Sequence, residues 1–236
     1  AMELADRYGI GCVALARTNH WLRPGSYGIQ AAEQGYLAIL WTNTIPNMPP
    51  WGGKEAKLGN NPVVMAVPSR RGVVLLDAAM SMFSYGKLES YARSGKPLPV
   101  DGGLDEKGQP TRDATEVLRT KQPLPIGFWK GSGMSLMLDL MAAALSGGRT
   151  VREVGELEQE TELSQVFLVM KLDAFGDQEI LLDKIDATLQ ELESCPALGQ
   201  DIQVRWPGQG MQRVRKESME QGILVEESIW EQVQNL

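Results

Sequence analysis

The sequence predicts a fold in which strands and helices are intermixed, of class α/β or α+β. Short apolar runs rich in β-branched residues, typical of buried strands, alternate with segments whose apolar residues recur at helical spacing. Of the 236 residues, 43% are hydrophobic and 22% are charged, so the chain can bury a core of ordinary size. This length predicts one large domain or two small ones. The sequence shows no internal repeat, heptad pattern or low-complexity tract.

The first third of the chain predicts most of the sheet. Residues 1–10 have the pattern of the last turns of an amphipathic helix, which Gly9 ends. A second, short helix is expected over residues 26–34, and Gly35 ends it. The apolar runs predict four strands, at residues 11–16, 36–42, 63–67 and 73–77. The segment 43–61 is rich in proline and glycine, and loops of this length in compact domains tend to be functional.

The rest of the chain is predicted to be mainly helical. Residues 131–145 are apolar almost all round, so we expect a buried helix there. Residues 96–125 are polar and rich in glycine and proline, which favours a surface excursion without a core element. The remaining expected elements are a helix from about Ser84, a central strand over 163–172, a surface helix over 180–193, a turn over 206–210, and helices over 211–221 and 226–233 bracketing a short strand at 223–225.

Charge and cysteine content exclude several classes of partner and site. The 23 Lys and Arg residues against 30 Asp and Glu residues give a net charge of −7, which argues against binding to nucleic acid or to an anionic membrane surface. Cys12 and Cys195 are far apart and show no Cys-x-x-Cys spacing, so neither a zinc site nor a disulfide framework is indicated, and a reduced, cytoplasmic setting is predicted. Cys12 lies in an apolar run and is expected to be a small buried residue. No apolar stretch is long enough to span a bilayer.

Familiar catalytic and cofactor motifs are absent or weak. Gly131-Ser132-Gly133 begins like a dinucleotide fingerprint, but Leu136 stands where the third small residue is needed and no strand directly precedes it. There is no Walker A motif, no Gly-x-Ser-x-Gly and no histidine-rich metal cluster. A Ser-His-Asp apparatus would depend on His20, the one histidine of the chain.

Polar residues at the predicted strand ends are the candidates for function. His20 follows the first strand and Asn43 follows the second, whereas Asn61 precedes the third. Each also has a structural interpretation: a loop histidine, a turn-capping asparagine, and an asparagine held in a turn before Pro62. Asp77 ends a strand, where it can bond ribose hydroxyls or cap the helix that follows.

Lys130 stands just before the apolar helix, beside a glycine-rich turn. Its ammonium group and free backbone N–H groups at the helix start would face the same anion, which predicts a phosphate site. The alternative is a solvated lysine beside a turn.

Several of these loops together resemble one family. The strings that carry the resemblance are Asn19-His20-Trp21, Gly25-Ser26-Tyr27-Gly28, Trp41-Thr42-Asn43, Met48-Pro49-Pro50-Trp51-Gly52, Ser81-Met82-Phe83-Ser84-Tyr85-Gly86, Leu98-Pro99-Val100-Asp101-Gly102-Gly103 and Trp129-Lys130-Gly131-Ser132-Gly133-Met134-Ser135. They resemble, in order and along the whole chain, the malate/L-lactate dehydrogenase family of non-Rossmann NAD(P)-dependent oxidoreductases.

The resemblance implies a mixed, largely antiparallel sheet flanked by helices, a homodimer, and hydride transfer between a nicotinamide cofactor and a 2-oxo or 2-hydroxy acid. The substrate it implies is a 2-oxo sugar acid, and the cofactor is NADH, with NADPH as the alternative. His20, Asn43 and Asn61 would line the substrate pocket. The residues carried over to the cofactor are Val73, Val74, Leu75, Leu76, Asp77, Ala78, Ala79, Trp129, Lys130, Gly208, Gln209 and Gly210. No metal ligand is implied.

The sequence departs from the family pattern in two places. Gln209-Gly210 stands where a close relative within the family carries His-Glu. The family also places its proton-donating histidine in a Ser-His-Gly motif of an N-terminal helical segment, which supplies a substrate-binding arginine as well. This chain contains no Ser-His-Gly, so we expect it to be the central and C-terminal portion of such an enzyme and assign it no catalytic residue.

Two hypotheses follow from the sequence. The first is an NAD(P)-dependent oxidoreductase whose cofactor-binding core spans residues 11–172, with C-terminal helices over 180–236 packing back on it. The second is a degenerate, non-catalytic chain that serves as a nucleotide-binding or dimerising module.

Overall fold

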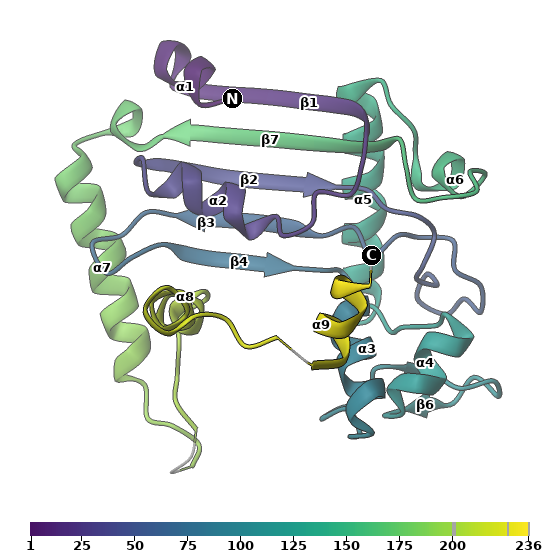
Figure 1. The fold of residues 1–236 in the computed structure, drawn as a ribbon. Helices are drawn as coiled ribbons and strands as arrows, with labels where there is room; N and C mark the ends of the chain where they lie inside the picture. Colours follow the sequence, from purple (N-terminus) through teal and green to yellow (C-terminus); the bar gives the residue numbers. More distant parts are fainter. Residues whose placement is uncertain (200–201, 226, 236) are drawn as a thin grey trace.

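Five strands form one antiparallel sheet in the computed structural model of the protein (Figure 1). The structure describes residues 1–199, 202–225 and 227–235. The order across the sheet is β1, β7, β2, β3, β4, and every neighbouring pair is antiparallel. Their bounds are β1 Ile10–Thr18, β7 Leu163–Lys171, β2 Tyr36–Thr42, β3 Val63–Val67 and β4 Val74–Ala78. The largely antiparallel sheet expected from the sequence is therefore confirmed.

Helices lie on both faces of this sheet and around its ends (Figure 1). A second, two-stranded sheet pairs β5 with β6 beside α3 and α4. The other elements are α1 Met2–Tyr8, α2 Gly25–Ala32, α3 Tyr85–Ser94, β5 Gly103–Leu104, β6 Pro110–Thr111, α4 Ala114–Thr120, α5 Trp129–Ser146, α6 Val151–Val154, the 3₁₀ helix η1 Leu172–Phe175, α7 Gln178–Ser194, α8 Gln209–Gln221 and α9 Glu227–Gln234.

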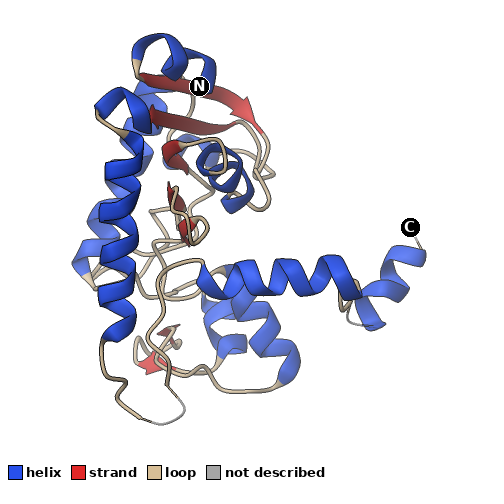
Figure 2. Ribbon diagram, turned by 90° about the vertical axis from the view of Figure 1, so that its left-hand side faces the viewer, coloured by secondary structure: helices blue, strands red, loops and turns tan. Residues whose placement is uncertain are grey.

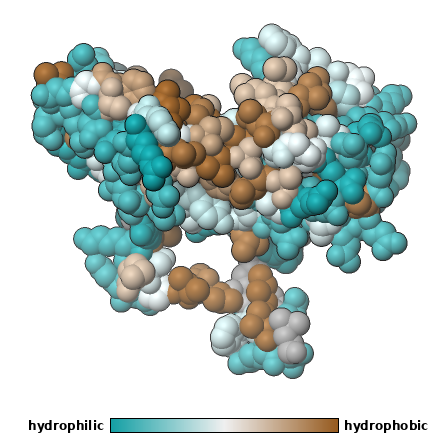
Figure 3. All heavy atoms as spheres, turned by 90° about the horizontal axis from the view of Figure 1, so that it is seen from above, coloured by the Kyte–Doolittle hydropathy of each residue, from teal (hydrophilic) through white to brown (hydrophobic). Residues whose placement is uncertain are grey.

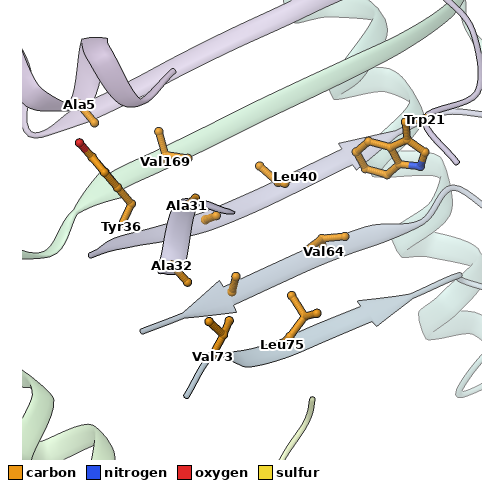
Figure 4. Packing of buried hydrophobic residues seen from close by; sticks show 12 residues of the cluster. Ala5, Trp21, Ala31, Ala32, Tyr36, Leu40, Val64, Val73, Leu75 and Val169 are labelled. Carbon is orange, nitrogen blue, oxygen red and sulfur yellow. The ribbon is translucent and has the colours of Figure 1, made fainter. Parts of the chain in front are cut away.

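Two hydrophobic clusters hold the helices on the sheet. On one face, Ala31 and Ala32 of α2 pack with Leu40, Val64 and other strand residues (Figure 4). On the other face, Leu138 and Ala142 of α5 pack with Trp41, Val63 and Val166. Small residues on α2 permit a close approach: a Cβ at Gly28 would lie 2.8 Å from Val64 Cγ1.

The apolar helix α5 is not buried as the sequence predicts. Its inner face contacts the sheet, but six large apolar side chains are exposed: Met134, Leu136, Met137, Leu140, Met141 and Leu145. The helix is apolar all round, yet the described part of the chain covers only one side of it.

Three smaller expectations are also wrong. Residues 96–125 are not a surface excursion without a core, because Leu98 and Val117 are fully buried against Leu88 of α3. Residues 223–225 form no strand, since they pair with no strand in the described part of the chain. Cys12 is exposed on β1, one of the two edge strands of the sheet.

The C-terminal helices differ in how they meet the sheet. Arg70, in the turn between β3 and β4, ties α7 down through Glu179 at 2.7 Å and Asp183 at 2.6 Å. Beyond the buried Trp206, α8 and α9 extend away from the rest of the molecule (Figure 2). The division into a cofactor-binding core and C-terminal helices that pack back on it stays a prediction.

Candidate functional site

One end of the sheet gathers the predicted substrate residues. Because neighbouring strands are antiparallel, β1, β2 and β4 finish at the end where β3 and β7 begin. His20 follows β1, Asn43 follows β2, and Asn61 directly precedes β3, so all three lie at this end. Helix α5 crosses the sheet at the same end (Figure 1).

Asn43 is fully buried, and its side chain is occupied by the protein itself. Its Nδ2 donates to Asp139 Oδ1 at 3.0 Å and to the carbonyl of Arg149 at 2.6 Å, and its Oδ1 accepts from the Ser164 backbone N–H at 2.8 Å. With both amide hydrogens used, Asn43 joins β2, α5 and β7. The structure thus gives it a role in holding the site together, and its contact with substrate stays a prediction.

Asn61 is held in the same way. Its Nδ2 donates to the carbonyl of Ser135 at 2.8 Å, and its Oδ1 accepts from Thr44 Oγ1 at 3.2 Å. Ser135 Oγ in turn donates to the carbonyl of Gly59 at 2.6 Å. The second predicted substrate residue therefore fixes the long loop 43–61 to α5.

His20 lies apart from these networks. Its side chain is exposed, and its Nδ1 accepts from the backbone N–H of Leu22 at 3.0 Å. Trp21, the next residue, is buried against Tyr27 and Phe167. No hydrogen bond within the described ranges joins His20 to Asn43 or Asn61, so its place in a substrate pocket stays a prediction.

Asp139 gives the site a pH-dependent element. The carboxyl is buried inside α5, and this burial raises its pKa, although hydrogen bonds from Asn43 and Val151 oppose the shift. A carboxyl whose pKa is raised on folding costs stability when ionised, and this cost disappears as the pH falls through the folded-state pKa towards the ordinary value.

Asp139→Asn is therefore expected to be more stable than the wild type at neutral pH, with the difference shrinking to zero in acid. Urea denaturation followed by circular dichroism from pH 7 to pH 3 measures it. Glu158→Gln, which changes an exposed carboxyl with no hydrogen bond or ion pair in the described residues, is the control and should show no such trend. A stability difference for Asp139→Asn that grows as the pH falls would contradict a raised pKa of the Asp139 carboxyl.

Two predicted cofactor segments, 130 residues apart, meet at the start of β4. The backbone N–H of Leu75 donates to the carbonyl of Pro207 at 2.9 Å. Gly208 follows with φ +89°, and a Cβ there would lie 3.0 Å from both the Leu75 nitrogen and the Leu75 Cβ. In the sequence, only the family resemblance points to Gly208, since its partner on β4 is too distant in the chain for any local pattern to reveal.

Gly208→Ala is expected to destabilise the protein more than Gly222→Ala. Both glycines have φ near +90°, so each alanine costs about 1 kcal/mol of backbone strain. Only Gly208 also faces β4, whereas Gly222 has open space, so the first variant should lose about 1 to 2 kcal/mol more. Equal melting temperatures for the two variants would show that a Cβ at position 208 does not clash with Leu75 of β4.

The outer edge of β4 is open between its two ends. Because the Leu75 N–H points away from the sheet, strand alternation turns the N–H group of Asp77 to the same outer edge. All five residues of β4 are register partners of β3, and the same alternation turns the N–H groups of Val74, Leu76 and Ala78 towards that strand. A ligand approaching this edge therefore meets backbone donors and acceptors with no strand partner in the part of the chain that the structure describes.

Asp77 has a structural partner that the sequence did not reveal. Its Oδ2 accepts from the backbone N–H of Gly25 at 3.0 Å, so it caps α2, an earlier helix, and not the segment that follows it. Burial raises the pKa of this carboxyl, while the Gly25 N–H and the charge of Arg23 lower it. One carboxylate thus joins β4 to α2.

Trp129 and Lys130 lie at the other end of β4. Met80 lies two residues after the end of β4, and its carbonyl accepts from the backbone N–H of Ile126 at 2.9 Å. This bond holds the segment before α5 near the end of β4, and α5 begins three residues later, at Trp129. Both side chains are exposed, and Lys130 forms no ion pair in the described residues. The helix start is less open than predicted, because the N–H groups of Lys130 and Gly131 donate to the carbonyls of Gly127 and Ile126 at 3.2 and 2.8 Å.

A groove of about 1140 Å³ opens at the Gly208 end of β4, between α2 and α8. Val73, Leu75 and Gly208 line it together with apolar residues of both helices. Arg215 in its wall is neutralised by Glu33 at 2.8 Å, whereas Arg23 and Lys216 form no ion pair in the described ranges. The sequence predicted both helices but not that they would face each other.

Gln209 follows Gly208 as the first residue of α8. Its Nε2 donates to Glu193 Oε1 at 2.7 Å, and its Oε1 is buried with no hydrogen-bond partner among the described residues. Gly210, the third residue of this segment, lies in the first turn of α8.

The three predicted cofactor segments therefore line up along one strand. The Gly208 turn lies at its start, the open edge follows, and Trp129 and Lys130 lie beyond its end, over a strand of five residues or about 17 Å. This arrangement suits an extended ligand with apolar ends and a negatively charged group near Lys130. In the part of the chain that the structure describes, no helix has both the length and the apolar composition to cross a bilayer, and no three His, Cys, Asp or Glu side chains are grouped as metal ligands.

Comparison with known proteins gives consistent matches. The family model for malate/L-lactate dehydrogenase matches residues 1–234. The 2,3-diketo-L-gulonate reductase of Klebsiella pneumoniae is 43% identical over 237 residues, which cover 100% of this chain and 71% of the relative. The enzyme of the same name from Pasteurella multocida is 42% identical over 238 residues, with the same coverage.

Solved structures show the same fold. A malate dehydrogenase from Pyrococcus horikoshii OT3 is 28% identical with a TM-score of 0.87, covering 100% of this chain and 66% of that one. A malate dehydrogenase from Entamoeba histolytica is 22% identical with a TM-score of 0.93, covering 100% and 70% of the two chains, a likeness of fold alone.

Proposed function

We propose, from the premise that the chain belongs to the malate/L-lactate dehydrogenase family, that it binds NADH along β4 and takes part in reducing 2,3-diketo-L-gulonate to 3-keto-L-gulonate. The relatives are named as reductases and dehydrogenases, so the chain is an oxidoreductase. The substrate is proposed from the relatives that share more than 40% of its residues over its whole length.

The observation that carries the proposal is the alignment of the three cofactor segments along β4. Gly208 permits a close approach at the start of the strand, and Lys130 offers a cation with no ion pair in the described residues at its end. Gln209 Oε1 is a buried acceptor without a partner among the described residues, as expected of a group that a ligand completes. The residues present therefore fit a dinucleotide.

Each group has a role in holding such a ligand. The backbone edge at Asp77 orients it, and Lys130 pairs with a phosphate. The bound cofactor supplies the hydride for the carbonyl carbon of the 2-oxo acid. The carbonyl oxygen also needs a proton. His20 is exposed and bonded to Leu22, so we assign the proton donor to no side chain of the described residues.

A second candidate is the non-catalytic nucleotide-binding or dimerising module. It is favoured by the observation that Asn43 and Asn61 are buried and bonded within the protein, which leaves fewer side chains for substrate. Both candidates bind the cofactor, but only the first reduces the oxo acid.

The test follows NADH oxidation at 340 nm with 2,3-diketo-L-gulonate, and with oxaloacetate as the competing oxo acid. We expect turnover with the sugar acid, and Lys130→Ala should raise the KM for NADH about tenfold, because a charged hydrogen bond is lost. Lys121→Ala, another exposed lysine, is the matched control and should leave KM unchanged. NADH binding without turnover would favour the second candidate, and turnover of oxaloacetate alone would overturn the substrate.

The homodimer implied by the sequence belongs to the same proposal. It is supported by the uncovered apolar side chains of α5, which a partner would bury.

A further inference from the structure

Glu193 lies near the end of α7 and is mostly buried, unlike most acids of this surface helix. The left-hand side of Figure 3, where Figure 1 places α7, is mainly hydrophilic. The side chains of Glu179 and Asp183 are 75% and 73% exposed, whereas that of Glu193 is 23% exposed. Removing a carboxylate from water is costly unless hydrogen bonds replace its hydration, so the partners of Glu193 indicate what it does.

The two oxygens of the Glu193 carboxylate have separate partners. Oε2 accepts from Nη2 of Arg71, in the turn between β3 and β4, at 2.5 Å. Oε1 accepts from Trp206 Nε1 at 2.9 Å and from Gln209 Nε2 at 2.7 Å. One carboxylate thus joins α7 to the sheet through one oxygen and to the segment that contains Gly208 through the other.

The charge of Glu193 fixes which way the Gln209 amide faces. The hydrogen bond from Arg71 is the main reason that the pKa of Glu193 lies below its ordinary value; those from Trp206 and Gln209 add to it, and burial opposes it. The carboxyl is therefore ionised at neutral pH and can only accept hydrogen bonds. Because only the NH₂ end of an amide can donate, Gln209 must turn its Oε1 away from Glu193.

This orientation decides which chemistry Gln209 can offer to a ligand. Its Oε1 is buried and accepts no hydrogen bond from the described residues. A buried acceptor without a donor costs free energy, so the donor that completes it is expected to come from a bound molecule. Gly208, the preceding residue, lines the groove between α2 and α8. The group that pairs with Oε1 must carry an N–H or O–H, and a phosphate oxygen does not meet this requirement.

We propose that Glu193 is a positioning residue for the cofactor, which acts through Gln209 and presents Gln209 Oε1 to an amino or hydroxyl group of the dinucleotide. The inference rests on the proposed function for the identity of the ligand. Arg71 bonds the other carboxylate oxygen, so it can be replaced without removing a donor from the Gln209 side. This division separates the positioning role of Glu193 from its part in the ion pair.

The first test is isothermal titration of NADH into the full chain. Glu193→Gln is expected to weaken binding about fivefold, because a neutral amide at position 193 no longer fixes the orientation of Gln209. Glu191→Gln, on the same helix, is the matched control: the Glu191 side chain is exposed, with no hydrogen bond or ion pair in the described residues, and its change should leave the affinity unchanged.

Arg71→Gln is the control for a merely structural role. It breaks the same ion pair as Glu193→Gln and should lower the melting temperature similarly, yet NADH affinity should stay within about twofold of the wild type. An equal loss of affinity in the two variants would reduce Glu193 to a structural ion pair and overturn the proposal.

The second test is a double-mutant cycle between Glu193 and Gln209. Gln209→Leu removes both ends of the amide and should weaken NADH binding about tenfold, and adding Glu193→Gln should then cause no further loss. In the assay at 340 nm, each loss should raise the KM for NADH and leave kcat unchanged. Additive losses in the cycle would show that Glu193 does not act through Gln209.

The outcomes distinguish this inference from the proposed function. A folded wild type that binds no NADH would overturn both. A wild type that binds NADH, together with a Glu193→Gln variant of equal affinity, would overturn the positioning role alone and leave the cofactor site along β4 standing.

Discussion

Replacing Asn43 by alanine is expected to lower the free energy of unfolding by about 3 kcal/mol. The substitution removes three hydrogen bonds at a fully buried position and leaves the Ser164 N–H without its acceptor. Asp139 keeps only the Val151 N–H at 2.8 Å among its hydrogen bonds in the described residues. Urea denaturation followed by circular dichroism measures the loss.

Asn19→Ala provides the matched control for this prediction. Asn19 is exposed, and its side chain makes no hydrogen bond in the described residues, so its loss should change stability by less than about 0.5 kcal/mol. If Asn43→Ala were as stable as Asn19→Ala, the buried network would not hold the strand ends to α5, and Asn43 would be free to serve a substrate.

Gly28→Ala is expected to cost about 2 kcal/mol, although alanine favours a helix more than glycine does. The added Cβ would lie 2.8 Å from Val64 Cγ1 and 3.1 Å from Leu75 Cδ1, both in the buried cluster between α2 and the sheet. Since both side chains are buried in this cluster, the helix must shift away from the sheet. Calorimetric melting temperatures measure the effect.

The same substitution at Gly86 should raise the stability of the protein, whereas at Gly28 it should lower it. Gly86 lies in the first turns of α3, where a Cβ meets nothing within 4 Å, so Gly86→Ala is expected to gain about 0.5 kcal/mol. A gain in stability at both positions would show that α2 does not pack on β3 and β4 as closely as described.

Most strands could be predicted because each is a short apolar run bounded by turn residues. The strands at residues 36–42 and 63–67 were predicted with their full ranges, and the other two strands of the N-terminal third shift by a residue or two at their ends. The run at 223–225 has the same local character and forms no strand, because a strand also needs a neighbour with which to bond. The family and the antiparallel sheet, expected from the seven sequence strings, are confirmed.

The candidate site could be predicted only in part, because it also depends on contacts between residues that are distant in the chain. The sequence placed polar residues at strand ends, but the partners that occupy them are distant in the chain: Asn43 bonds Ser164, and Asn61 bonds Ser135. Likewise, periodicity showed that α5 is apolar all round, and what covers each side depends on contacts that no local pattern records. The substrate and cofactor roles of the carried-over residues stay predictions.

Isothermal titration of NADH into the folded chain tests the central claim most directly. We expect saturable binding of one NADH per chain, with an affinity that Lys130→Ala weakens about tenfold and Lys121→Ala leaves unchanged. The absence of binding heat at millimolar NADH, in protein shown to be folded by circular dichroism, would contradict the assignment of β4, the Gly208 turn and the start of α5 as a cofactor site.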